Sequence, residues 1–396
     1  MKRRIHFLLI LLILLTACQA AFAQEAEDLT KRCTLKATVD QERVNRINNG
    51  RYDQYWSGTG GSLTIRLPEG EACQGISLSF FRDAAPLTVY VMTDMGMWKR
   101  EAVYADGFRN AYIPVQARGE ISVSASNGQA EWALSALSVW GEGELPESVQ
   151  RWTSWQPDEE ADLLLFATHP DDELIWFGGL IPYYTVERDM KVQVAYADGA
   201  YSPSRVNELL DGLWHCGVRR YPELGPFRDF KVKSEGLVRG RWGKNAAETW
   251  CTAVIRRYRP KVVVTHAQNG ESGHNQHKVL SKAVVNAATE WAGNAEKDPD
   301  SAKSYGTFTP QKLYLHRYGK EQTFLDWTQP LSTFNGKTGA EIAQEAFDKH
   351  ISQDRSGYRI YVSGPNDSRY FGLYYSLVGP DEARDDLFEH IENSGE

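Results

Sequence analysis

The pattern of apolar and polar residues changes near residue 161 and predicts two kinds of domain. Between residues 30 and 145, short stretches alternate apolar and polar positions, as in Leu63–Leu67 and Ile121–Ala125. Turn residues such as Asn127-Gly128 separate these stretches. Short alternating strands at this spacing predict an all-β sandwich.

From residue 161 onward, apolar runs alternate with amphipathic stretches of helical length. This alternation predicts βαβ units and a mostly parallel sheet. No Gly-x-Gly-x-x-Gly or Walker A motif follows a strand, so the sequence has no nucleotide-binding fingerprint. The expected strands are residues 163–168, 191–196, 261–266 and 311–316, and the expected helices are residues 173–184, 204–216, 246–258, 274–291 and 338–350.

The first 23 residues have the form of a signal peptide. Basic residues 2–4 precede an apolar run, residues 5–15, that is too short to span a membrane. Two processing sites remain open: cleavage after residues 21–23, or a bacterial lipobox at residues 15–18 that would leave Cys18 with a lipid anchor. Both predict an exported bacterial protein, either secreted or held at the cell envelope. No other stretch is apolar enough for a membrane span.

The expected domain boundaries follow from these patterns. The sandwich covers residues 30–145, a linker covers residues 146–160, and the second domain covers residues 161–396. The linker contains two prolines and several acids, but Trp152 and Trp155 predict that it packs against a domain.

Composition narrows the possible functions. A chain of 396 residues suggests about two domains, and 42% hydrophobic residues are enough for two full cores. The net charge is −8, and no basic tract follows the signal peptide. These two properties argue against nucleic-acid binding.

The cysteines beyond Cys18 are even in number. Cys33 and Cys73 lie in the first half of the chain, and Cys216 and Cys251 lie in the second. An even number of cysteines in an exported chain predicts disulfides, most economically one within each half. Four free buried thiols are the alternative. No Cys-x-x-Cys motif is present, which argues against a thiolate zinc site.

Two polar clusters follow buried strands of the second domain. His169-Pro170-Asp171-Asp172-Glu173 comes directly after the run Leu163–Thr168, and His274 and His277 follow the strand at 261–266. The carboxyl ends of strands in such a sheet form its ligand-binding edge. Each cluster alone fits a helix cap or surface histidines. Together they fit a mononuclear zinc site with three protein ligands and one open position.

These clusters resemble the paired motifs of the PIG-L/LmbE family of zinc-dependent N-deacetylases, over roughly residues 155–396. The resemblance implies an α/β Rossmann-like domain behind the jelly-roll sandwich. It implies that His169, Asp172 and His277 bind one Zn²⁺. Asp171 would be the general base, and protonated His274 would assist at the carbonyl centre.

Other positions have weaker assignments. Arg205 matches a family position that can contact substrate, whereas Ser272 stands where a number of relatives have Tyr. Asp198 follows the second strand and either lines the pocket or caps a turn. Glu271 could orient a ligand histidine, and His266 could lie behind the metal or face substrate. The remaining histidines in this domain, His215, His316, His350 and His390, are expected on the surface or in packing roles.

The sandwich loosely resembles a galactose-binding-like module. Such modules bind glycans through aromatic residues in loops, which makes Tyr52, Tyr55, Trp56 and Trp98 candidates, with core or interface packing as the alternative. The resulting expectation is an exported zinc hydrolase that removes N-acetyl groups from an N-acetylglucosamine-type sugar or glycan by means of an activated water. The alternatives are a zinc hydrolase of another amide or ester and a non-catalytic glycan-binding protein.

Overall fold

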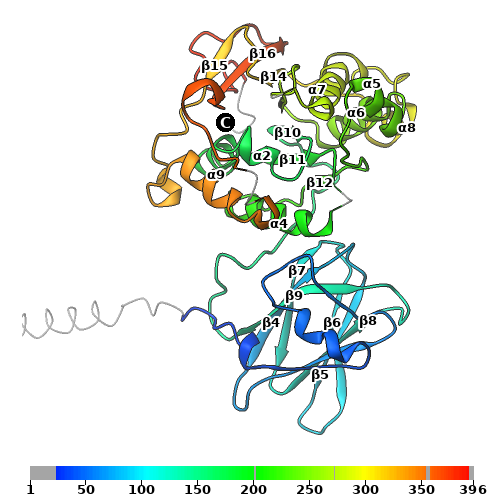
Figure 1. Cartoon of the computed structure of the whole chain (residues 1–396). Coiled ribbons are helices and arrows are strands. Elements are labelled where there is room, and N and C mark those ends of the chain that lie inside the picture. The colour runs from blue at the N-terminus through cyan, green and yellow to red at the C-terminus, as the bar shows by residue number, and fades with distance from the viewer. Residues whose placement is uncertain (1–23, 200–201, 272, 354–356, 392–396) are drawn as a thin grey trace, which may run out of the picture.

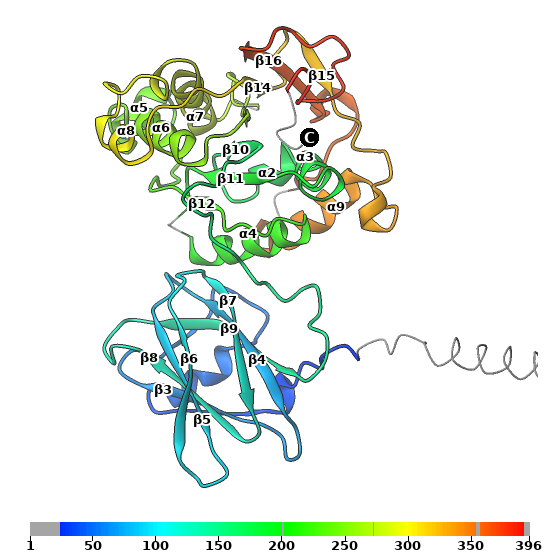
Figure 2. The ribbon, with the colours of Figure 1, turned by 180° about the vertical axis from the view of Figure 1, so that it is seen from behind.

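A computed structural model describes residues 24–199, 202–271, 273–353 and 357–391. Figures 1 and 2 show an all-β domain at the N-terminal side and an α/β domain built from the rest of the chain. This two-part organisation agrees with the sequence pattern. The predicted signal peptide, Cys18 and Ser272 lie outside the described residues. Within the described residues, no helix has the length and apolar character needed to cross a membrane.

The first domain is a sandwich of two antiparallel sheets. Apolar side chains from both sheets, including Trp56, Ile76 and Val123, form one core between them. The larger sheet has the order β1 (Thr34–Ala37), β3 (Ser62–Arg66), β8 (Glu120–Ala125), β5 (Leu87–Met92) and β6 (Trp98–Tyr104); the smaller has the order β2 (Trp56–Ser57), β9 (Ala133–Gly141), β4 (Cys73–Phe80) and β7 (Asn110–Ala117).

The second domain contains a seven-stranded sheet. The first five strands in its spatial order pair in parallel, and the last two, β16 and β15, add antiparallel pairings. The order is β12 (Glu223–Leu224), β11 (Val192–Tyr196), β10 (Leu163–Ala167), β13 (Val262–Thr265), β14 (Lys312–His316), β16 (Tyr370–Ser376) and β15 (Gln322–Phe324).

Helices cover both faces of this sheet because alternate strand residues point to opposite sides. Leu163 and Leu165 of β10 belong to one core, whereas Leu164 and Phe166 belong to another. The first core packs against α2 (Asp172–Ile175), α3 (Leu180–Pro182), α4 (Pro203–His215) and α9 (Gly339–Phe347). The second packs against α5 (Glu235–Trp242), α6 (Ala246–Tyr258) and α7 (Asn275–Asn286), and α8 (Pro299–Tyr305) lies against α6.

The helix predicted for residues 173–184 is not continuous. Only α2 and α3 are α-helical, and a turn at Trp176–Gly179 separates them. At Gly179 a Cβ atom would lie 2.2 Å from Trp327, and at Gly178 it would lie 2.6 Å from Ala343. The two glycines allow the chain to approach these neighbours closely, and the turn places Trp176 beside Asp172.

The cysteines contradict the predicted disulfides, because Cys33, Cys73, Cys216 and Cys251 are all free. Cys216 packs in the core on the α4 side of the sheet and Cys251 in the core on the α6 side, so the sheet separates them. Burial raises the pKa of both Cys33 and Cys73 to about 11. Both therefore remain protonated at neutral pH, where thiols are poorly reactive.

The two domains meet on helix α4. Tyr52 of the sandwich donates a 2.8 Å hydrogen bond to Asp211, and Asn207 donates a 3.0 Å bond to the carbonyl of Phe80. The linker also packs, since the ring of Trp152 lies 5.2 Å from that of Trp214. Tyr52 is therefore an interface residue. Trp56, fully buried in the sandwich core, cannot contact a glycan.

Candidate metal centre

The two polar clusters lie where the strand order of the sheet reverses. From β10 the chain continues outward through β11 and β12, whereas β13 and β14 lie on the other side of β10. The crevice outside the carboxyl ends of strands at such a switch point is the usual ligand site of open α/β sheets. His169 follows β10, and His266 follows β13.

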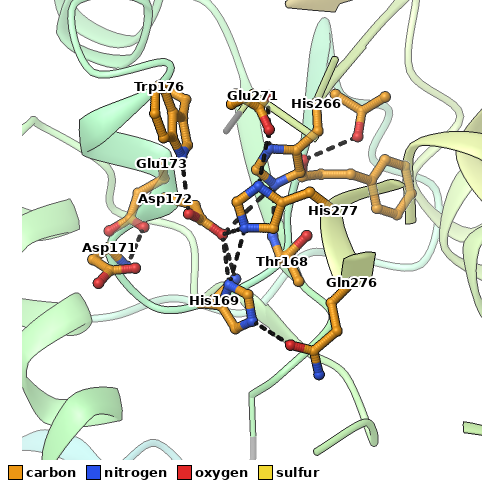
Figure 3. Close-up of polar contacts among 12 residues, drawn as sticks. Thr168, His169, Asp171, Asp172, Glu173, Trp176, His266, Glu271, Gln276 and His277 are labelled. Carbon is orange, nitrogen blue, oxygen red and sulfur yellow. Dashed lines mark hydrogen bonds and ion pairs between the residues drawn. The ribbon is translucent and has the colours of Figure 1, made fainter. Parts of the chain in front are cut away.

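Three predicted ligands converge there, as Figure 3 shows. His169 Nδ1 lies 3.0 Å from Asp172 Oδ2, and His277 Nε2 lies 3.2 Å from each of those atoms. Ligand atoms around zinc, with bonds of about 2.0–2.1 Å and near-tetrahedral angles, are about 3.3 Å apart. The donor set of two imidazoles and one carboxylate, and its spacing, therefore fit a zinc ion.

Contacts behind the ligands fix which atoms face the ion. His169 Nε2 lies 3.0 Å from Gln276 Oε1, and His277 Nδ1 lies 2.8 Å from Glu271 Oε2. Both oxygens accept hydrogen bonds, so the opposite ring nitrogens keep their lone pairs for the metal. Such partners orient ligand histidines in metalloproteins.

The electrostatics of the pocket favour positive charge. Although burial opposes it, the imidazoles of His277 and His169 hold the pKa of Asp172 well below its usual range. Burial also opposes protonation of His277, yet Asp172 and Glu271 raise its pKa to about 9. The carboxylates of Asp172 and Glu271 thus favour positive charge between these side chains.

Asp171 lies beside the ligands without joining them. Its backbone has φ 132°, a conformation that residues other than glycine rarely adopt, and its N–H donates a 2.8 Å bond to Glu173 Oε2. Its Oδ2 lies 2.9 Å from Arg205 Nη2. Burial raises the pKa of Asp171 to about 7, although Arg205 opposes the rise. A buried acid with a pKa near 7 suits a general base.

His274 is the residue before helix α7 and is exposed, with its ring 4.5 Å from that of His277. Burial of part of the ring, together with the positive charges of His277 and His169, lowers its pKa to about 4. This lowering favours the neutral imidazole, and the role of a protonated His274 stays a prediction. The neutral imidazole can still donate one N–H to a substrate oxygen.

His266 and Glu271 lie behind the ligands. Although His266 is close to Asp172 and His277, its Nε2 accepts a 3.0 Å hydrogen bond from the backbone N–H of Thr168. That nitrogen therefore has no lone pair left for a metal. Glu271 contacts His266, His277 and the buried His316, each within 3.2 Å.

A cavity of about 160 Å³ opens onto the ligands. Arg205 lines it, and its contact with substrate stays a prediction. Asp198 is buried near His169 but is not among the lining residues. The full lining is His169, Asp171, Asp172, Ile175, Trp176, Arg205, Asp229, His274, His277 and Tyr358.

The sequence interpretation missed several residues of this site. Asp229 Oδ1 lies 3.5 Å from His169 Nε2, and Trp176 Nε1 donates a 3.1 Å bond to Asp172 Oδ1. His316 was expected in a packing or surface role, yet it contacts Glu271. Only Gln276 carried a usable signal, because it stands between His274 and His277 on the first turn of a helix.

Comparison with known proteins finds relatives of the part of the chain that contains this site. Residues 164–288 match the family model described as PIG-L: GlcNAc-PI de-N-acetylase. A 1D-myo-inositol 2-acetamido-2-deoxy-alpha-D-glucopyranoside deacetylase of Rhodococcus opacus (strain B4) is 32% identical over 183 residues, which are 38% of this chain and 62% of the relative. The chain thus spans about 60% of the length of such curated relatives.

Two solved structures are similar at lower levels. N,N'-diacetylchitobiose deacetylase from Pyrococcus horikoshii is 17% identical with a TM-score of 0.37, covering 50% of this chain and 72% of that one. A family 32 CBM from C. perfringens NanJ, solved in complex with galactose, is 16% identical with a TM-score of 0.24, covering 29% of this chain and 97% of that one.

Proposed function

We propose that the PIG-L family domain formed by residues 164–288 makes this chain a zinc-dependent hydrolase that removes the N-acetyl group from an N-acetylglucosamine-type sugar. The observation that carries this proposal is the contact of three ligand atoms, at 3.0–3.2 Å, beside the unligated acid Asp171. One acid is fixed as a ligand and the other is free to move protons.

His169, Asp172 and His277 would hold the zinc ion. When bound, zinc supplies a positive charge that acidifies water and polarises a carbonyl group. The chain's own contribution is to hold the imidazoles of His169 and His277 in a single tautomer each, through the contacts of Gln276 and Glu271.

Asp171 takes a proton from the attacking water and passes it to the departing amine. Its pKa near 7 suits both directions of transfer, because neither form is strongly favoured at neutral pH. Arg205 holds the carboxylate in place from the side and also donates to the carbonyl of Pro170 at 2.6 Å. The strained backbone of Asp171 is thereby kept in one conformation.

His274 and the cavity wall orient the acetamide. The neutral imidazole of His274 donates an N–H to the carbonyl oxygen, where negative charge develops during attack. Ile175 and Trp176 provide apolar surface for the acetyl methyl group. The products are acetate and a free amine.

The experiment is acetate release from N-acetylglucosamine-containing substrates, with and without chelator, together with metal analysis. We expect chelator-sensitive release, loss of metal in His277→Ala, and retained metal with little turnover in Asp171→Asn. Full activity without metal, or in Asp171→Asn, would overturn the proposal. Chelator-sensitive hydrolysis of only other amides or esters would favour the alternative zinc hydrolase, and glycan binding without hydrolysis would favour a non-catalytic binding protein.

Export and glycan binding by the sandwich belong to the same proposal. The signal-like first 23 residues support export to the cell envelope or beyond. Trp98 is 45% exposed, and Tyr55 lines a cavity of about 590 Å³ in the sandwich. N-terminal sequencing and mass measurement of the mature chain would distinguish cleavage before Gln24 from lipidation at Cys18.

A further inference from the structure

Glu173 ends the first polar cluster, but its side chain is completely buried and does not line the metal cavity. Its Oε2 accepts the 2.8 Å hydrogen bond from the backbone N–H of Asp171 (Figure 3). The bond acts on the strained residue itself, whose φ is 132°. Such a conformation persists only where several contacts fix it. Glu173 provides one of these contacts, and Arg205 provides another from the carboxylate side.

The other oxygen of Glu173 faces His350, which comes from a distant part of the chain. Glu173 Oε1 lies 3.5 Å from His350 Nε2, within ion-pair distance, and both side chains are completely buried. Burial opposes protonation of His350, yet the Glu173 carboxylate raises its pKa. Within the part of the chain that the structure describes, neither ring nitrogen of His350 has a hydrogen bond of good geometry. Glu173 is therefore the carboxylate with which His350 pairs.

Packing fixes His350 between helices α4 and α9. Its backbone N–H donates a 2.8 Å bond to the carbonyl of Phe347, and its ring stacks on Phe347 with centroids 6.0 Å apart. Two residues later, the N–H of Ser352 donates a 2.9 Å bond to Glu208 of α4. A Cβ atom at Gly212 of α4 would lie 3.3 Å from His350 Nε2, so the glycine leaves room for the ring. The imidazole thus has a fixed position from which to act on Glu173.

Stability alone does not account for this pair. Replacing a buried ion pair by apolar side chains of similar volume is often neutral or stabilising, because the loss of hydration offsets the attraction. A buried pair that ends on a strained backbone has another use, since it can hold that backbone in place. His350 also lies outside residues 164–288, which match the family model. The contact is thus a feature of this chain beyond the matched segment.

We propose that His350 is a positioning residue of the metal centre. It fixes the Glu173 carboxylate, Glu173 holds the N–H of Asp171, and the Asp171 carboxylate is thereby kept beside the metal ligands. This inference rests on the proposed function, in which Asp171 moves the protons. Asp171 is then held from two sides, by Arg205 at its carboxylate and by the Glu173–His350 pair at its backbone.

The test compares His350→Gln with His350→Met in metal-loaded full-length protein. The two new side chains have similar length and volume, but only Gln keeps an N–H donor for Glu173. His350→Met should lower kcat about tenfold while KM and the metal Kd stay unchanged, because a displaced Asp171 slows proton transfer without weakening binding. His350→Gln should keep most of the wild-type kcat.

A second comparison shows whether His350 acts through Glu173. Glu173→Met should reproduce the loss of kcat, and adding His350→Met to it should lower kcat no further. The matched control is His215→Met, which breaks a partly exposed pair with Glu345 at 2.9 Å between α4 and α9 and should leave kcat unchanged. If His350→Met does not fold, His350→Phe replaces it, since a Phe ring can keep the stack on Phe347.

Hydrogen exchange of the Asp171 amide, followed by NMR, separates this inference from the proposed function. Exchange should be about tenfold faster in His350→Met than in the wild type, and unchanged in His350→Gln and His215→Met. If this pattern appears but no acetamide is hydrolysed, the positioning role stands and the deacetylase proposal fails. Unchanged exchange in His350→Met would overturn the positioning role. Wild-type kcat in His350→Met, or equal losses in His350→Met and His350→Gln, would also overturn it, because His350 would then only fill space.

Discussion

The indole Nε1 of Trp176 donates a 3.1 Å hydrogen bond to Asp172 Oδ1, while Asp172 Oδ2 faces His169 and His277. One carboxylate oxygen is thus held away from the position of the metal. This arrangement would let Asp172 offer a single oxygen to a metal ion.

Trp176→Phe should therefore weaken metal binding by about 10–100-fold, the usual cost of losing a hydrogen bond behind a metal ligand. Competition with a chromogenic chelator measures the metal Kd. Trp214→Phe, which removes a similarly buried indole at the domain interface, is the matched control. Equal metal affinity in the two variants would contradict the role of Trp176.

Arg205→Gln should move the acid limb of the pH profile. Burial raises the pKa of Asp171 to about 7 while Arg205 lowers it, so the base form is lost as pH falls below about 7. Removing Arg205 removes the lowering effect, and the limb of kcat/KM should shift to higher pH by about one unit or more. Arg259→Gln, which breaks a surface pair with Glu160, should leave the limb in place.

Tyr52→Phe should weaken the contact between the domains. Burial raises the pKa of Asp211 to about 6, while hydrogen bonds from Tyr52 and Gln150 lower it. At pH 8 the Asp211 carboxylate of the variant would accept one hydrogen bond fewer. This loss should lower the free energy of unfolding by about 1–3 kcal/mol. The loss should be smaller at pH 5, where Asp211 can hold a proton. Urea unfolding at both pH values measures it.

Tyr55→Phe is the control for that experiment. Tyr55 stacks on Phe81 with centroids 4.0 Å apart, and the stack does not depend on its hydroxyl. A penalty for Tyr52→Phe that matches Tyr55→Phe, or that grows at pH 5, would contradict the interface role.

Lys312→Met should strongly destabilise the second domain. Lys312 and Asp381 form a fully buried ion pair, and Tyr314 also donates to Asp381. Removing one partner leaves a buried charge, which costs about 3–5 kcal/mol. Lys282→Met, which breaks an exposed pair with Glu235, should cost less than about 1 kcal/mol in the same thermal unfolding measurement. Similar losses in both variants would argue against this account.

Strands with a clear apolar pattern were predictable, and edge strands were not. The strands at 163–168 and 261–266 were expected because their sequences are apolar runs. In the structure, every residue of β10 and β13 is buried. Strand β6 lies at a sheet edge, and its sequence is largely exposed and charged. Strand β7 is also an edge strand and contains Pro114, which suits an edge but weakens the strand signal.

The candidate site was predictable where its residues belong to short sequence motifs. His169, Asp172 and His277 belong to short motifs after strands, and the structure brings them together. Asp229 and Trp176 could not be assigned, because their roles depend on a loop path and on a helix interruption that glycine contacts determine. The predicted pairing of Cys216 with Cys251 failed because cysteine number contains no information about which face of a sheet each residue occupies.

Helix α4 belongs to both halves of the molecule at once. Arg205 on this helix holds Asp171, whereas Asn207 and Asp211, within two turns of it, hold the sandwich. Phe108 of the sandwich even packs in the core of the α/β domain. An isolated fragment starting near residue 160 would therefore expose aromatic surface and loosen the helix that holds Asp171, so the sandwich is not an interchangeable module of this chain.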